Sequence, residues 1–146
     1  MTNGEMRDGS PKEEPTGESF FPDKLLKLDG QVRRLHDRVS SYENLKAWIL
    51  RLPRVSEVPH KLGGTAFQAD GVEFMHSHGP SWLDIRLSKE DQASVLRKGL
   101  AFPHRADVHA RDGWVGYQME NSQDLAKAKR VIQLAYKNAK KNPRVF

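Results

Sequence analysis

Two histidines and a carboxylate stand close together in the middle of this 146-residue chain. His76 and His78 are two residues apart, and Asp84 follows a few residues later. Imidazole and carboxylate groups bind zinc and iron, and an aspartate can also orient a histidine that acts as a general base. The chain has no cysteine, which excludes disulfides, thiolate catalysis and cysteine-ligated metals. These residues are therefore the first candidates for chemistry.

The residues around this trio favour a β-hairpin that would bring its members together. Alternating apolar residues predict a strand on each side of the Gly-Pro-Ser turn that follows His78. In the register that we favour, His78 lies opposite Trp82 and His76 lies opposite Asp84, close enough to hydrogen-bond. A register shifted by one residue would place both histidines against aliphatic side chains and leave their donors unpaired.

Three functions are open for this cluster, and a purely structural interpretation stands beside them. His76 and His78, with His104 further along the chain, could bind zinc or iron. Asp84 could instead orient His76 as a general base, or the set could bind an anionic ligand with Arg86 nearby. In the structural interpretation, a buried histidine–aspartate pair fixes the hairpin register and the neighbouring tryptophans belong to the core.

The rest of the pattern predicts an α+β domain in which an antiparallel sheet of about four strands is covered by helices on one face. The expected strands are 65–69, 72–77, 82–87 and 114–119, with a short helix between the last two and a final helix after Ser122. We expect a disordered acidic tail at 1–19, an N-terminal helix at 20–44 and a single α+β domain at 45–142.

The N-terminal helix carries one apolar stripe at alternating steps of three and four residues. Its members are Leu25, Leu28, Val32, Leu35, Val39 and Tyr42. We expect a break at Ser40-Ser41 and a second, shorter helix that ends at Pro53. The stripe either packs on its own domain or forms a homodimer through the 25–42 helix, and we favour the first.

The net charge of +5 is uneven, because residues 1–20 are acidic while residues 21–146 hold 22 basic and 14 acidic residues. This balance suits ordinary solubility, but it also allows a non-enzymatic nucleic-acid binder. The residues that would contact phosphates lie on the last helix: Lys127, Arg130, Lys137 and Lys140. No apolar run is long enough for a membrane span, and we expect a cytoplasmic protein.

Part of the chain resembles the small bacterial luciferase-domain proteins. The matching motifs are Leu50-Arg-Leu-Pro53-Arg-Val55, Gly63-Gly64, Glu73-Phe-Met-His76-Ser-His78-Gly79, Asp84-Ile-Arg-Leu87, Gly99-Leu-Ala-Phe-Pro-His104, Gly113-Trp114-Val115 and Leu134-Ala-Tyr136. The resemblance implies that six residues form one cluster: Glu73, His76, His78, Asp84, His104 and Trp114. It implies no particular reaction.

The order of the later elements is also similar, more loosely, to YjbR-type, CyaY-like proteins, some of which are described as DNA-binding. Taken together, the sequence predicts a small domain whose His/Asp pocket binds a small ligand or a metal and could also catalyse a reaction. In this pocket His76 and Asp84 would be catalytic, while Glu73, His78, Arg86, His104 and Trp114 would contact the ligand. The alternative is the nucleic-acid binder that uses the basic last helix.

Overall fold

The structure, a computed structural model, describes residues 23–60 and 63–141, with side chains from residue 29 onward. The expected tail at residues 1–19 lies outside the described residues. The chain divides into two compact units, Met1–Leu35 and His36–Phe146, and the sheet belongs to the second. Among the described residues, no helix combines the length and the apolar character that crossing a membrane would need.

Helix α1 spans Asp23–Leu50 without interruption, so the predicted break at Ser40-Ser41 is wrong. Serine is only mildly unfavourable inside a helix, and Ser41 is itself buried. The next turns place Leu45 and Ile49 in the core, where they are at most 1% exposed. Burial of these two side chains outweighs the weak local preference of the serines, because tertiary packing supplies most of the stability of a helix.

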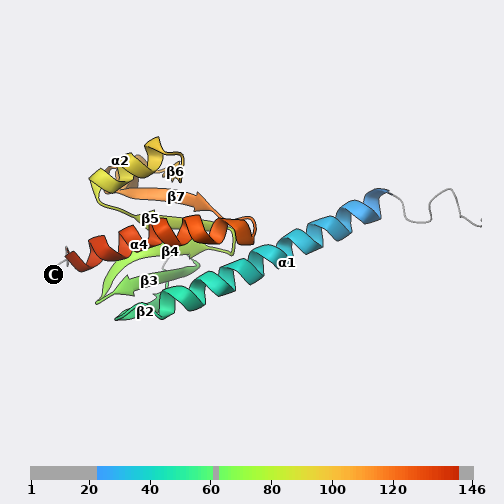
Figure 1. The fold of residues 1–146 in the computed structure, drawn as a ribbon, viewed down its shortest axis with the longest axis horizontal. Coiled ribbons are helices and arrows are strands. Elements are labelled where there is room, and N and C mark those ends of the chain that lie inside the picture. The colour runs from blue at the N-terminus through green and yellow to red at the C-terminus, as the bar shows by residue number, and fades with distance from the viewer. Residues whose placement is uncertain (1–22, 61–62, 142–146) are drawn as a thin grey trace, which may run out of the picture. The chain divides into compact units, whose positions relative to one another are not determined.

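The remaining elements form one antiparallel sheet with helices between and after its strands (Figure 1). They are β2 (Val55–Pro59), β3 (Thr65–Ala69), β4 (Val72–His78), β5 (Trp82–Arg86), α2 (Lys89–Arg97), β6 (Phe102–Pro103), α3 (Asp107–Arg111), β7 (Trp114–Gln118), the 3₁₀ turn η1 (Ser122–Asp124) and α4 (Leu125–Lys141). The strand order is β2-β3-β4-β5-β7-β6. The predicted α+β class and antiparallel sheet are thus confirmed.

The sheet has two more strands than the four expected, β2 and β6, and these are its edges. Both contain a proline, Pro59 and Pro103, which cannot donate to a neighbouring strand and is therefore tolerated at a sheet edge. These strands are five and two residues long, and each holds a proline. Neither shows the alternation of apolar and polar residues by which a strand is recognised in a sequence.

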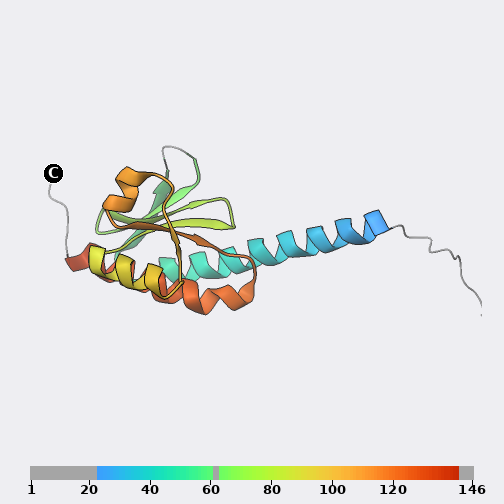
Figure 2. The ribbon, with the colours of Figure 1, turned by 90° about the horizontal axis from the view of Figure 1, so that it is seen from above.

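One face of the sheet packs against helices and forms the core. Figure 2 shows α4 and α2 along the same side of the sheet, and α4 lies across β3, β4 and β5. The buried side chains on this face are Phe67 from β3, Met75 from β4, Leu83 and Ile85 from β5, and Val115 from β7. Val131, Ile132 and Ala135 of α4 complete the core. Because strand side chains alternate between faces, the residues between these point to the opposite face, where the polar cluster lies.

Candidate functional site

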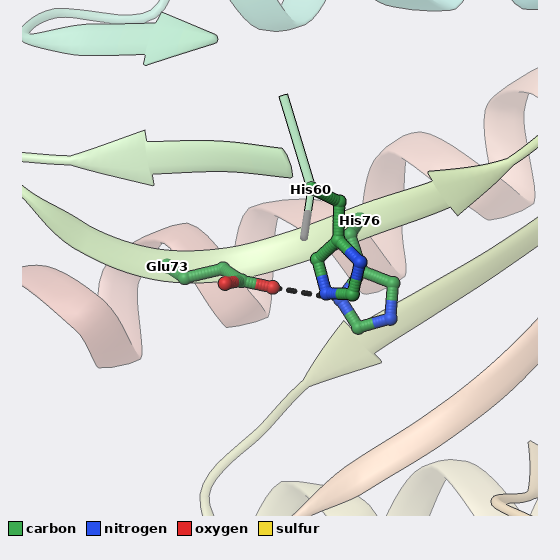
Figure 3. Close-up of side chains that lie close together, drawn as sticks. All are labelled: His60, Glu73 and His76. Atoms are coloured by element: carbon green, nitrogen blue, oxygen red, sulfur yellow. Dashed lines mark hydrogen bonds and ion pairs between the residues drawn. The ribbon is translucent and has the colours of Figure 1, made fainter. Parts of the chain in front are cut away.

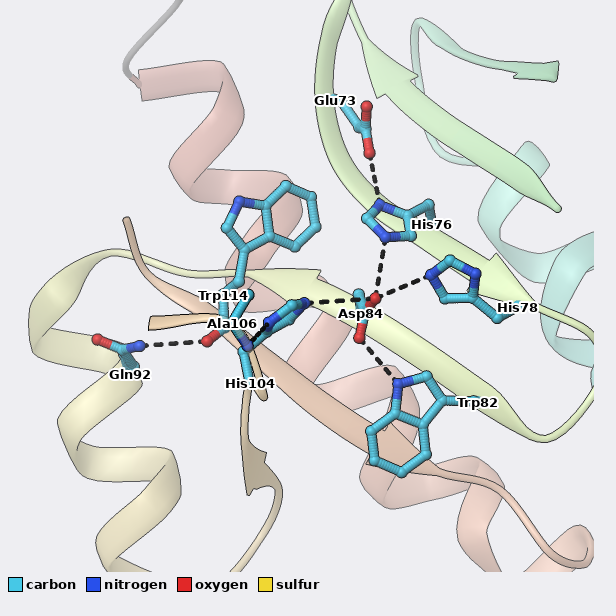
Figure 4. Close-up of polar contacts among 9 residues, drawn as sticks. All are labelled: Glu73, His76, His78, Trp82, Asp84, Gln92, His104, Ala106 and Trp114. Atoms are coloured by element: carbon cyan, nitrogen blue, oxygen red, sulfur yellow. Dashed lines mark hydrogen bonds and ion pairs between the residues drawn. The ribbon is translucent and has the colours of Figure 1, made fainter. Parts of the chain in front are cut away.

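Strands β4 and β5 pair in the register that the sequence predicts, with His76 opposite Asp84 and His78 opposite Trp82. Both histidines point toward the same carboxylate oxygen, as Figure 4 shows. Nε2 of His76 lies 2.9 Å from Oδ2 of Asp84, and Nε2 of His78 lies 3.0 Å from it. The Asp84 side chain is only 7% exposed, so its charge is held by these contacts rather than by water.

His104 approaches the same oxygen from the edge strand β6. Phe102 pairs with Gly116 of β7, and Gly116 pairs with Asp84, so the chain that leaves β6 passes close to Asp84. Nε2 of His104 lies 3.5 Å from Oδ2 of Asp84, while its Nδ1 accepts a hydrogen bond of 3.1 Å from the backbone N–H of Ala106. An Nδ1 that accepts carries no proton, so the proton of a neutral His104 is on Nε2 and faces the carboxylate.

The second oxygen of Asp84 accepts a hydrogen bond from Trp82. The distance from the indole Nε1 to Oδ1 is 2.9 Å. Gly116 makes room for this ring, because a Cβ at that position would lie 2.5 Å from Cζ2 of Trp82. The glycine is therefore required by the close approach of an aromatic ring and not by an unusual backbone angle.

Glu73 reaches the other nitrogen of His76, and a β-bulge is what allows it. In a regular strand, residues three apart point to opposite faces. Here Gln68 of β3 pairs with Glu73 but Phe67 pairs with Met75, which leaves Phe74 as an extra residue in β4. The bulge turns Glu73 to the face of His76, and Oε2 of Glu73 lies 2.7 Å from Nδ1 of the imidazole (Figure 4).

His60 is also part of the cluster, although no sequence pattern predicts a role for it. It directly follows β2, and its ring stacks on that of His76 with centroids 4.1 Å apart (Figure 3). The ring of His78 is also near, at 5.8 Å. His60 lies here because the edge strand β2 pairs with β3. Its place in the cluster could therefore have been predicted only by recognising residues 55–59 as a strand.

The carboxylates keep His76 positively charged. Burial alone lowers the pKa of His76, but the hydrogen bonds with Asp84 and Glu73 outweigh burial and raise this pKa from 6.5 to about 9. Burial alone raises the pKa of Asp84, but the hydrogen bonds from His76 and Trp82 lower it from 3.8 to about 2. The pKa of His60 is lowered by burial and then by the charge of His76.

The other two residues expected at the site lie in different surroundings. Trp114 is 8% exposed and packs on His76, with ring centroids 5.0 Å apart, so it joins the cluster. Arg86 follows Asp84 on the same face but turns to Asp112, whose Oδ1 lies 3.3 Å from its Nη2. Arg86 lines neighbouring cavities and is not part of the one that Asp84 lines.

A cavity of about 370 Å³ opens beside the cluster and is lined by His78, Trp82, Asp84, His104 and Arg105. Cavities of a few hundred Å³ suit small organic ligands. The guanidinium of Arg105, another residue that no sequence pattern marks, lies 5.6 Å from the centroid of the Trp82 ring. The cavity thus combines an aromatic wall with a guanidinium group that can donate hydrogen bonds to an anion.

Two chemical uses fit this geometry. His76, His78 and Asp84 each offer one ligand atom, and these atoms lie within 4.8 Å of one another, as a metal site requires. A second group of the same kind contains His60, Glu73 and His76. Without a metal, Asp84 holds the proton of His78 on Nε2, which leaves Nδ1 of this 39% exposed side chain as a proton acceptor.

The basic residues of the nucleic-acid alternative are all exposed on α4, away from this cluster. Arg130 and Lys137, together with Lys98, line a groove of about 270 Å³ against α2. Lys127 and Lys140 do not line it, and the ammonium group of Lys140 lies over the ring of Tyr136 at 5.3 Å.

The fold and the cluster define a small α+β domain with a buried His/Asp site that is compatible with a ligand or a metal. Residues 71–135 match the model of the family described as Luciferase domain. The match confirms the resemblance to luciferase-domain proteins, and it includes the whole predicted cluster from Glu73 to Trp114. A search of curated proteins and a search of solved structures each found no match. The looser similarity to YjbR-type proteins stays a prediction.

Proposed function

We propose that His76, His78 and Asp84 hold one divalent transition-metal ion, and that the adjoining cavity binds a small organic anion next to it. The observation that carries the proposal is the convergence of two imidazole nitrogens on one buried carboxylate oxygen, at 2.9 and 3.0 Å. Neighbouring ligand atoms in a tetrahedral zinc site with bonds of about 2.0–2.1 Å are roughly 3.3 Å apart. Only a small outward movement of these side chains is needed to admit an ion.

The partners of each ring decide which histidines are suitable ligands. A metal-binding histidine normally donates its other N–H to a carboxylate or a carbonyl, which fixes the ring. Nδ1 of His76 is placed to donate to Glu73, which supports metal binding through Nε2. His104 has the opposite arrangement, because its Nδ1 accepts from Ala106 and its Nε2 therefore keeps its proton. We accordingly revise the expected trio of His76, His78 and His104 by replacing His104 with Asp84.

Two histidines and one carboxylate leave open positions on the ion, and this ligand set is used for Fe(II) as well as for Zn(II). His78 and Asp84 line the cavity, so the open positions face it. Arg105 then supplies donors for a negatively charged group such as a carboxylate, and Trp82 supplies a flat apolar surface. The proposed activity is therefore metal-assisted chemistry on a small organic anion.

Elemental analysis of protein purified without a histidine tag tests the metal. We expect close to one zinc or iron per chain, and removal by a chelator followed by addition of Co(II) should give a visible spectrum typical of histidine and carboxylate ligands. His78→Gln should weaken Co(II) binding at least ~10-fold, whereas the exposed His36→Gln should leave it nearly unchanged. Metal-free protein that does not bind Co(II) would contradict the proposal and leave the Asp84–His78 pair as a proton-transfer group.

The anion site is tested separately with azide on the Co(II) protein. Azide should occupy an open position and change the visible spectrum, and Arg105→Gln should raise the azide concentration needed roughly threefold to tenfold through the loss of one nearby charge. Arg97→Gln, on helix α2, is the matched control. An unchanged spectrum at high azide concentration would show that no open position faces the cavity.

A second candidate, nucleic-acid binding, is supported by the groove that Lys98, Arg130 and Lys137 line between α2 and α4. Phosphate contacts weaken steeply as salt rises, so retention of single- or double-stranded nucleic acid should be strongest near ~50 mM salt. Reversing the charges of four of the basic residues on α4 should abolish it: Lys127, Arg130, Lys137 and Lys140. No retention of the parent protein at that salt concentration would end this alternative.

A further inference from the structure

The first part of helix α1 exposes a row of large apolar side chains. Val32 is 58% exposed, Leu35 is 52% exposed and Val39 is 42% exposed. They are half of the large hydrophobic residues that are exposed in the described part of the chain. Isolated exposed hydrophobics are common, but a row of three along one helix is typical of a surface that binds a partner. These three side chains therefore leave one face of α1 open to a partner.

The spacing and the residue types of the row fit a two-stranded coiled coil. Val32 and Val39 are one heptad apart, and Leu35 lies between them, so the valines occupy position a and the leucine position d. A β-branched residue at a with leucine at d favours a parallel dimer. In the sequence, Leu25 and Leu28 continue the same pattern toward the N-terminus. Gly30 falls at position f, on the side away from such a seam.

The charges beside the row favour a second copy of this chain in parallel orientation. In a parallel dimer, a residue at g faces the residue at the following e position of the partner. Arg38 at g and Glu43 at e have opposite charges, and the sequence repeats this arrangement at Lys24 and Asp29. In an antiparallel dimer, g positions face g positions and e positions face e positions, so neither of these oppositely charged pairs would form.

The apolar row of Val32, Leu35 and Val39 ends where α1 begins to pack against the sheet, at Tyr42. The hydroxyl of Tyr42 lies 2.8 Å from Oγ of Ser77, and Leu45 is fully buried. The next a position is Lys46, which pairs with Glu57 at 3.2 Å. From these observations we infer that the part of α1 before Tyr42 forms a short, parallel, in-register coiled coil with a second copy of the chain. A seam of about three heptads is near the lower limit of stability, so the dimer should be weak and concentration-dependent.

Sedimentation equilibrium of the full chain, from about 1 µM to about 1 mM, measures the association. We expect a monomer–dimer equilibrium that Leu35→Glu weakens at least ~10-fold, because it places a charge at a core position. Arg34→Glu introduces the same residue on the outer side of the helix and should leave the equilibrium nearly unchanged. A parent protein that is monomeric over the whole range would overturn the inference.

Charge exchange tests the register. Arg38→Glu should weaken the dimer several-fold, by roughly the strength of two surface ion pairs, and so should Glu43→Arg. The double variant should recover the parent's association, because the opposite charges face each other again. Residues five apart on one helix do not contact each other, so this recovery cannot come from within a chain. Single variants that associate like the parent would refute the proposed register.

Cross-linking tests the orientation, and the absence of cysteine makes it simple. Leu35→Cys in a parallel in-register dimer brings the two thiols together, so mild oxidation should give a disulfide-linked dimer rapidly. Arg34→Cys is the control and should cross-link slowly. Equal rates for the two variants would show that Leu35 does not lie at a parallel seam, even if the protein were dimeric.

Discussion

The two faces of strands β4 and β5 differ sharply, although they are built from alternate residues of the same short segments. On one face, Met75, Leu83 and Ile85 are inaccessible to solvent and pack against helices. On the other face, His76 and Asp84 are also mostly buried, but each is held by hydrogen bonds and charge. The apolar face stabilises the fold without depending on pH, whereas the polar face holds charged groups that a ligand or a metal can use.

The difference shows why the polar cluster has to be complete. A buried carboxylate without partners is strongly destabilising, but here the two oxygens of Asp84 accept from His76, His78 and Trp82. The cluster is therefore tolerated next to a hydrophobic core because its hydrogen-bonding groups satisfy one another. Substitutions on the apolar face should therefore alter mainly stability. Substitutions on the polar face should alter both stability and ligand or metal binding.

The largest effect is expected on the apolar face. Leu83→Ala removes a fully buried side chain from the middle of the sheet. It should lower the free energy of unfolding by about 2–5 kcal/mol through lost burial and a residual cavity. Denaturant unfolding followed by circular dichroism measures this loss. A loss of unfolding free energy below ~1 kcal/mol would contradict the view that the apolar face supplies most of the stability of these strands.

A smaller loss is expected on the polar face. His76→Ala takes one donor from the buried carboxylate of Asp84 and should lower the free energy of unfolding of the metal-free protein by about 1–3 kcal/mol. His36→Ala, at an exposed position of α1, is the control and should change stability by less than ~0.5 kcal/mol. If the His76 variant were as stable as the parent, the cluster would be strained, as sites adapted to binding often are.

The two faces should also respond differently to pH. The raised pKa of His76, about 9, means that its stabilising contribution is complete below pH 6.5 and is lost as the pH rises toward 9. The lowered pKa of Asp84, about 2, means that its contribution is present above pH 3.8 and is lost as the pH falls toward 2. Unfolding of metal-free protein as a function of pH should show both losses. The His76→Ala variant should lack the alkaline one, and an identical alkaline profile would contradict the assignment.

The smallest change is expected from Gly116→Ala, which tests the contact between strand β7, next to β5, and the ring of Trp82. The added Cβ would lie 2.5 Å from that ring, so the indole has to shift, which disturbs its hydrogen bond with Asp84. We expect a loss of about 1 kcal/mol in stability and a shift of the Trp82 indole N–H signal in NMR spectra. Gly71→Ala, where the added Cβ meets nothing within 4 Å, controls for steric contact, although its positive φ adds backbone strain of its own. An unshifted indole signal would show that the ring does not depend on the glycine.

Much of the cluster followed from local patterns in the sequence. Alternation of side chains along a strand, with a turn of suitable length, was enough to predict that His76 faces Asp84 and His78 faces Trp82, because hairpin register depends on neighbouring residues. The apolar periodicity likewise determined the α+β class, the four inner strands and the final helix, since the core-facing residues recur at the period of each element.

Tertiary structure alone decided the rest. The bulge that turns Glu73 toward His76 depends on the pairing of β4 with β3, and nothing in the local pattern marks it. His60 and Arg105 reach the site through edge strands too short to be found by periodicity. The continuity of α1 across its serines depends on the burial of Leu45 and Ile49. In each case, contacts between segments distant in the sequence outweigh a weak local preference, and a local pattern does not contain that information.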